Sequence, residues 1–153
     1  MYFSSFTTLI VFAYAAITCS GSLLEARNAT VASKLAAMKE FLATIDPSEV
    51  TYLGDSERVI NGLQPLAPDT VTVVYCSIVS SGLCGGSCTT YVGGPTCLSA
   101  PNTNCLSATG NVAFCDRGGC GGSCHNYASC GTHLQGSFCD TPGTASILVP
   151  SGE

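Results

Sequence analysis

Residues 82–91 read Gly-Leu-Cys-Gly-Gly-Ser-Cys-Thr-Thr-Tyr, and residues 118–127 read Gly-Gly-Cys-Gly-Gly-Ser-Cys-His-Asn-Tyr. Seven of these ten positions are identical. An aromatic residue followed by cysteine precedes each stretch, and two further cysteines follow it. The pattern predicts an internal tandem repeat, with one copy at residues 75–105 and the other at residues 114–139.

Working outward from the repeat, the cysteines indicate a disulfide framework. Of the eleven cysteines, all except Cys19 lie between residues 76 and 139. A dense and even set of cysteines in an exported chain is typical of disulfide bonding. The predicted disulfide cysteines are Cys76, Cys84, Cys88, Cys97, Cys105, Cys115, Cys120, Cys124, Cys130 and Cys139. Each repeat holds five of them, so full oxidation requires at least one bridge between the repeats; the connectivity is otherwise open.

The N-terminus predicts export. An apolar run from Leu9 to Ile17 ends in small residues, which is typical of a signal peptide, and we assign it to residues 1–20 with cleavage between Cys19 and Ser22. The run is short and interrupted for a membrane-spanning helix. We therefore expect a secreted, extracellular protein that does not associate with the membrane after cleavage.

Charge narrows the range of partners. Charged residues make up 10% of the chain and the net charge is −5, with five Lys and Arg in all. Between the first and last predicted bridge cysteines the only formal charges are Asp116 and Arg117. Binding to nucleic acid needs clustered basic residues, so we expect no nucleic-acid partner.

Residues 21–68 contain no cysteine and favour helix. Apolar residues spaced three and four apart predict one helix from about Leu23 to Ile45. The apolar stripe consists of Val31, Leu35, Met38, Leu42 and Ile45. Asp46-Pro47-Ser48-Glu49 predicts a helix restart, Asp55-Ser56-Glu57 a short helical turn that stops at Gly62, and Gln64 to Pro68 a boundary.

This segment has three possible roles. It could be a pro-segment, although it has no dibasic pair for a processing protease, or its stripe could bind a partner helix. The interpretation we favour is that the stripe packs on the cysteine-rich half or on a second copy of the chain.

Residues 69–150 are predicted to form a disulfide-rich domain made of the two repeats. From Cys76 to Cys139 there are twelve large apolar residues against twelve glycines, so we expect bridges to supply stability that a small core does not. Residues 70–75 favour a strand, and the glycines of Cys-Gly-Gly-Ser-Cys are expected to adopt positive φ angles. The predicted fold class is α+β, a helical segment followed by a small disulfide-rich module with short strands and a tandem repeat.

Catalytic and metal chemistry find little support. Cys120, Cys124, His125 and His133 could surround zinc, but oxidised cysteines are not ligands, so we predict no metal and no cofactor. Ser87 and Ser123 recur in the repeat without a recurring histidine beside them. Nucleophilic serine needs a base within hydrogen-bond reach, so we predict no catalytic residues and no enzyme.

Two further features suggest binding, and a third predicts a modification. Tyr91 and Tyr127 occupy equivalent repeat positions and could stack on sugars, and the Gly-Leu-Cys-Gly-Gly stretch resembles hevein-type chitin-binding modules. Residues 92–96 and 134–136 are candidate exposed loops of an enzyme (protease) inhibitor. Asn28-Ala29-Thr30 is a sequon that predicts a glycan on Asn28.

The whole layout resembles the fungal small secreted cysteine-rich proteins, a class defined by composition that includes effector candidates. The resemblance rests on the signal, the cysteine-free helical stretch and the nearly uncharged cysteine repeats. It implies a secreted, disulfide-stabilised, non-enzymatic protein that acts through protein interaction. The alternatives are a cell-wall or chitin/glycan-binding protein and an enzyme inhibitor, so the expected partner is an extracellular protein or a cell-wall glycan.

Overall fold

The computed structural model describes residues 20–62 and 67–151. The predicted signal peptide lies outside these residues except for Ser20, where the first helix begins. None of the helices in the described ranges has the length and apolar character that crossing a membrane requires.

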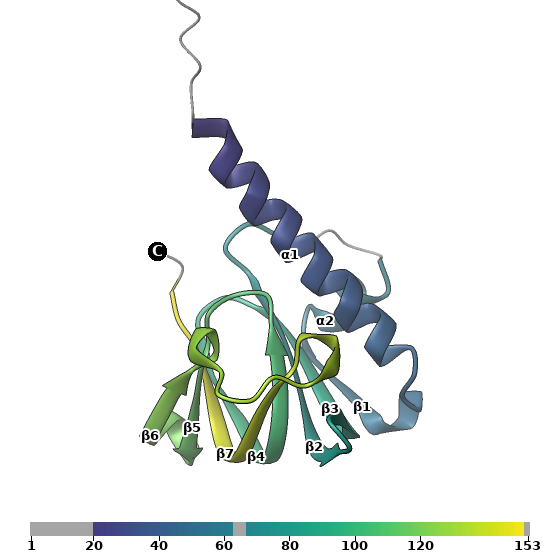
Figure 1. The fold of residues 1–153 in the computed structure, drawn as a ribbon, viewed down its shortest axis with the longest axis vertical. Helices are drawn as coiled ribbons and strands as arrows, with labels where there is room; N and C mark the ends of the chain where they lie inside the picture. Colours follow the sequence, from purple (N-terminus) through teal and green to yellow (C-terminus); the bar gives the residue numbers. More distant parts are fainter. Residues whose placement is uncertain (1–19, 63–66, 152–153) are drawn as a thin grey trace, which may run out of the picture.

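Within the described residues, seven strands form one mixed sheet in the order β1-β3-β2-β4-β7-β5-β6 (Figure 1). The strands are β1 (Val50–Gly54), β2 (Val71–Ser80), β3 (Leu83–Gly93), β4 (Thr96–Ala108), β5 (Ala113–Arg117), β6 (Gly121–Asn126) and β7 (Cys139–Val149). β1 runs parallel to β3, and the other neighbouring strands are antiparallel. The helices are α1 (Ser20–Leu42) and α2 (Ser56–Ile60), with short 3₁₀ turns η1 (Pro47–Glu49), η2 (Gly118–Cys120), η3 (Tyr127–Ser129) and η4 (Gln135–Ser137).

The fold class predicted from the sequence is wrong. The chain does not form a helical segment followed by a small module with short strands, because the sheet takes strands from both halves and four of its strands are 10 to 13 residues long. Nor do the repeats form two equal modules. The first covers most of three strands, whereas the second covers β5, β6 and only the first residue of β7.

The physical reason is that several strands bury hydroxyl side chains instead of large apolar ones. Threonine is β-branched and fits a pleated surface well, while strand pairing satisfies the backbone. The buried polar residues of the strands are Thr72, Thr90, Thr103, Ser107, Thr141, Thr144 and Ser146. Hydrophobic counting therefore underestimated the strand content of these stretches.

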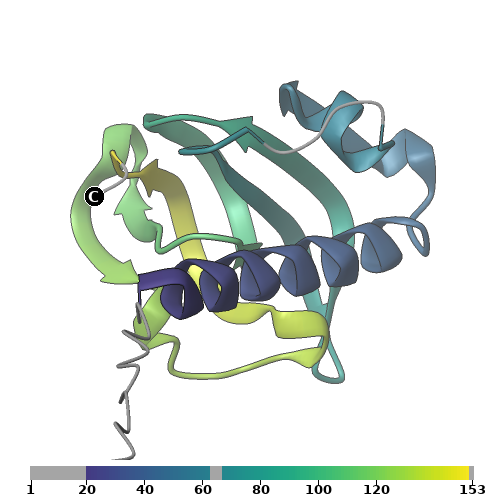
Figure 2. The same cartoon turned by 90° about the horizontal axis from the view of Figure 1, so that it is seen from above.

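α1 lies across one face of the sheet, as the view from above shows (Figure 2). Met38 and Leu42 of the predicted stripe are buried in a cluster with Val74, Phe138 and four bridge cysteines. Phe41 packs on the same cluster, with its ring centroid 4.5 Å from that of Phe138. The structure thus supports packing of the stripe on the cysteine-rich half.

A second core cluster occupies the other face of the sheet. Residues along a strand alternate between faces, so Val73 and Tyr75 point away from the side where Val74 packs. They pack with buried side chains of β4 and β7, including Leu106 and Ile147. The buried residues of this cluster include no cysteine, in contrast to the four in the first cluster.

The link between α1 and β2 is only partly helical. Asp46 caps η1, since its carboxylate accepts hydrogen bonds from the backbone N–H and the hydroxyl of Ser48. These bonds lower the pKa of Asp46 below its usual value. The chain then extends into β1 instead of continuing as the predicted helix restart, whereas the short helix predicted at residues 55–62 is present as α2.

Candidate functional site

Five disulfides join all ten predicted cysteines. The pairs are Cys76–Cys88, Cys84–Cys105, Cys97–Cys120, Cys115–Cys124 and Cys130–Cys139. Only Cys97–Cys120 connects the two repeats. The expectation of at least one bridge between the repeats is therefore confirmed.

The repeated motif gives two hairpins with the same bridge. Cys76 lies directly opposite Cys88, and Cys115 directly opposite Cys124, with a Cα–Cα distance of 4.1 Å in each pair. The second glycine of each Gly-Gly pair has a positive φ angle, 79° at Gly86 and 78° in the second copy. The positive φ angle expected for the motif is therefore found at its second glycine.

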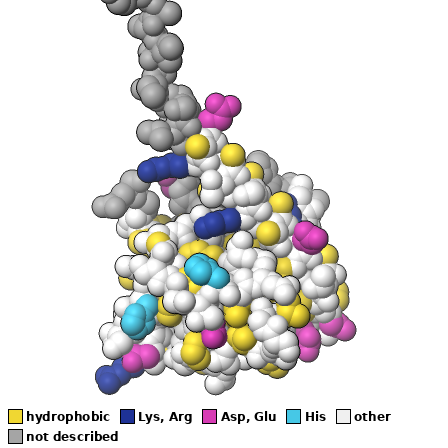
Figure 3. All heavy atoms as spheres, in the orientation of Figure 1, with side chains coloured by type: hydrophobic (Ala, Val, Ile, Leu, Met, Phe, Trp, Pro, Cys, Tyr) yellow, Lys and Arg dark blue, Asp and Glu magenta, His cyan; other side chains and the backbone are white. Residues whose placement is uncertain are grey.

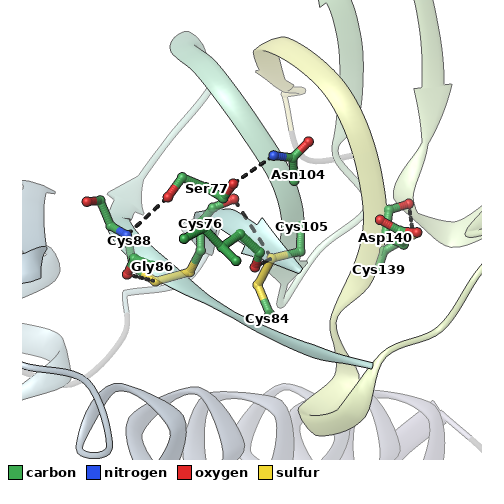
Figure 4. The surroundings of a disulfide bond; sticks show 11 residues. Cys76, Ser77, Cys84, Gly86, Cys88, Asn104, Cys105, Cys139 and Asp140 are labelled. Carbon is green, nitrogen blue, oxygen red and sulfur yellow. Dashed lines mark hydrogen bonds between the residues drawn. A yellow bond between two sulfur atoms is a disulfide. The ribbon is translucent and has the colours of Figure 1, made fainter. Parts of the chain in front are cut away.

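The first hairpin, β2–β3, is held from two sides. Figure 4 shows the Cys76–Cys88 bridge within the hairpin beside the Cys84–Cys105 bridge, which ties it to β4. The side-chain amide of Asn104 donates to the carbonyl of residue 77 at 2.7 Å, also tying the hairpin to β4. A loop held at so many points loses little conformational entropy when it binds.

The tip of this hairpin borders an apolar groove beside α1. Leu83 is 51% exposed and, together with Phe41, lines a hollow of about 350 Å³. Gln135 and Gly136 of η4 form another wall, and the backbone N–H of Gln135 donates to the carbonyl of Gly82 at 3.1 Å. This hollow, the helix–hairpin groove, therefore includes part of one of the two predicted loops.

The second exposed apolar side chain of the hairpin is Ile78, which is 53% exposed. It lies over Gly86, where an added Cβ would come within 2.8 Å of the Ile78 side chain. Ile78 and Leu83 thus place two large, half-exposed apolar side chains on one disulfide-bonded hairpin.

The two tyrosines proposed for sugar stacking lie in different elements and have different hydrogen-bond partners. Tyr91 lies on β3 and donates its hydroxyl hydrogen to the carbonyl of Gly94 at 2.8 Å, and burial raises the pKa of its phenol. Tyr127 lies in η3 and donates to the carbonyl of Ser137 at 2.7 Å, while the Lys34 ammonium sits 5.2 Å from its ring centroid. Both rings are half-buried and pack on the second core cluster.

The residues considered for catalysis and zinc lie as follows. Ser123 and His125 of β6 line a hollow of about 120 Å³ together with Asp116, whose carboxylate accepts a hydrogen bond from the backbone N–H of Ser123 at 2.9 Å. His125 packs beside Phe114, with ring centroids 5.8 Å apart. The Asp116 carboxylate thus orders the hairpin backbone.

The two cysteines considered above as zinc ligands are not free thiolates. Cys120 and Cys124 are each disulfide-bonded. Within residues 20–62 and 67–151 no group of three or more His, Cys, Asp or Glu side chains is arranged to hold a metal.

The remaining surface is weakly charged. Basic side chains stand singly on the face drawn in Figure 3. Asn28 is exposed on α1, and the Thr30 hydroxyl of its sequon donates to the carbonyl of Ala26 at 2.9 Å. The sequon is therefore accessible in the folded chain.

Sequence reasoning did not identify Leu83 or Phe41 as functional residues. Leu83 lies within the repeated motif, but its position is glycine in the second copy, and both residues gain their surroundings from distant segments. A lone exposed leucine in the printed sequence gives no signal of the groove. Comparison of the chain with family models, with curated proteins and with solved structures found no match.

Proposed function

We propose that this chain is a secreted, non-enzymatic protein that binds an extracellular protein partner through the helix–hairpin groove and the exposed tip of the β2–β3 hairpin. The observation that supports the proposal best is the position and exposure of Leu83. It is more than half exposed at a hairpin tip fixed by disulfides, and it borders a hollow that continues to Phe41.

The extracellular setting is supported by the five disulfides, since such bridges persist in oxidising compartments. The interaction itself is supported by shape and chemistry. Binding energy at protein interfaces concentrates where an apolar side chain fills a well-packed hollow. The groove offers such a hollow, with Glu40 and Gln135 as polar groups at its edge.

The test places a photo-crosslinking amino acid at position 83, with a matched control at Leu148, which is 39% exposed on β7. Both proteins are added, oxidised, to intact cells and extracellular fluid of candidate target tissue. We expect one discrete protein adduct from position 83 that excess unlabelled wild-type chain removes and that excess Leu83→Asp chain does not remove.

Equal adducts from the two positions, or an adduct that wild-type chain fails to compete away, would contradict the proposal. Retention on insoluble chitin or glucan, abolished by changing Tyr91 and Tyr127 to Ala, would instead favour the glycan-binding alternative.

A further inference from the structure

A second hollow, distinct from the helix–hairpin groove, lies where α1 meets the turn after β4. It has a volume of about 420 Å³ and is bordered by Lys34 of α1, Asn111, Tyr127 of η3, His133, and Ser137 of η4. The volume is in the range of small-molecule sites. We call it the Lys34 pocket; its lining comes from α1, from residues 109–111 and from residues 127–137.

The Lys34 ammonium lies at the wall of this pocket. Nζ donates to the carbonyl of Ala108 at 3.4 Å and lies over the face of the Tyr127 ring. An ammonium has three N–H groups. A carbonyl and an aromatic face do not neutralise its positive charge, and the side chain is half-buried, where charges are screened less than in open water.

The neighbouring groups also present donors. The side-chain oxygen of Asn111 accepts a hydrogen bond from the backbone N–H of Ala128 at 3.0 Å, so the NH₂ of the same amide is the group left for a ligand. The Tyr127 hydroxyl uses its hydrogen on the carbonyl of Ser137. His133 is exposed at the rim.

None of the residues that line the Lys34 pocket is an Asp or a Glu. This is notable in a chain with ten acidic and five basic residues, whose net charge of −5 repels anions in general. A pocket that holds a cation, a free amide NH₂ and an imidazole is complementary to a ligand with a negative charge and several acceptor oxygens.

We propose that the Lys34 pocket binds a hydroxylated carboxylate of monosaccharide size, that is, a uronate. The carboxylate pairs with Lys34, and the ring hydroxyl oxygens accept from the Asn111 amide and from His133. Half-buried Lys34 supplies the discrimination, because a neutral sugar of the same shape leaves its charge unpaired. The inference is independent of the protein interaction proposed above, since the two hollows share no lining residue.

The test uses three probes of one shape: galacturonate, its methyl ester and galactose. Each is titrated into oxidised protein by calorimetry and by ¹H–¹⁵N NMR. We expect galacturonate to bind at least tenfold more tightly than either neutral probe and to shift the Asn111 side-chain amide signals. Lys34→Gln should weaken galacturonate binding by at least tenfold, whereas Lys34→Arg retains most of it.

The matched control is Lys39→Gln, which removes one positive charge from the same helix but outside the pocket. It should bind galacturonate like the wild type. Thermal melts of every variant separate loss of the ligand contact from loss of helix packing, and the Arg variant keeps the test decisive if the Gln variant is destabilised.

Equal affinity for galacturonate and galactose, unchanged binding by Lys34→Gln in folded protein, or no binding of galacturonate would each overturn the proposal. None of these results bears on the adduct expected from position 83, so the two proposals fail separately.

Discussion

Replacing Gly86 with alanine should destabilise the first hairpin strongly, while the same change one residue earlier should not. Gly86 has φ +79°, a region that costs an L-residue about 1–2 kcal/mol. An added Cβ would also stand 2.6 Å from the Ser77 hydroxyl oxygen. That oxygen accepts from the backbone N–H of Ser87 at 3.1 Å, a hydrogen bond worth about 1 kcal/mol.

Against these costs, alanine restricts the unfolded chain and recovers about 0.4–1 kcal/mol. We therefore expect Gly86→Ala to lower the free energy of unfolding by about 2 kcal/mol. Gly85 has no positive φ, and an added Cβ there meets nothing within 4 Å. Gly85→Ala should consequently leave stability unchanged or raise it by up to about 1 kcal/mol.

The assay is urea unfolding of the oxidised proteins, followed by far-UV circular dichroism and tyrosine fluorescence, since the chain has six tyrosines and no tryptophan. A loss of about 2 kcal/mol corresponds to a fall in Tm of about 4–8 °C for a chain of this size. Coincident unfolding curves for the two variants would refute the assignment of distinct backbone roles to the two glycines.

Four further changes test separate parts of the structure. Met38→Ala, at a fully buried position, should cost about 2–5 kcal/mol in urea unfolding if α1 is part of the core. Limited reduction followed by alkylation and mass spectrometry should open Cys115–Cys124 before the two bridges beneath α1, because Cys124 is exposed. Burial raises the pKa of the Tyr75 phenol. The stability that the buried neutral phenol contributes is therefore complete below about pH 10 and is lost as the pH rises through the raised pKa. The midpoint of urea unfolding should fall less steeply with alkaline pH in Tyr75→Phe than in the wild type. Asn28→Gln should abolish the mass shift that a glycosidase produces on chain secreted from eukaryotic cells.

Local sequence signals predicted local structure well. The apolar spacing that places Met38 and Leu42 on one helix face is a property of the segment itself, and both residues are buried as expected. The positive φ of Gly86 and the cap at Asp46 likewise follow from residue type and its immediate neighbours.

Structure that depends on contacts between distant segments could not be predicted, because the sequence signals used were local. Residues 50–54 join the sheet because β3 offers them a parallel edge, which nothing within those five residues encodes. β7 occupies an inner position between β4 and β5, although its cysteine is only its first residue and the repeat ends there. The helix–hairpin groove and the Lys34 pocket also depend on contacts between segments far apart in the sequence. Leu83 and Lys34 therefore gave no local sequence signal of a binding site.

The two repeated hairpins differ most in what surrounds them, and this difference bears on function. α1 covers the first hairpin, so Cys76 and Cys88 are both buried, whereas in the second hairpin Cys124 is exposed. The position of Leu83 is glycine in the second copy, at residue 119. The presence of a second disulfide-bridged hairpin therefore does not by itself produce a second groove. The groove requires the helix above the hairpin and the leucine at its tip, and only the first copy combines a rigid bridge with both.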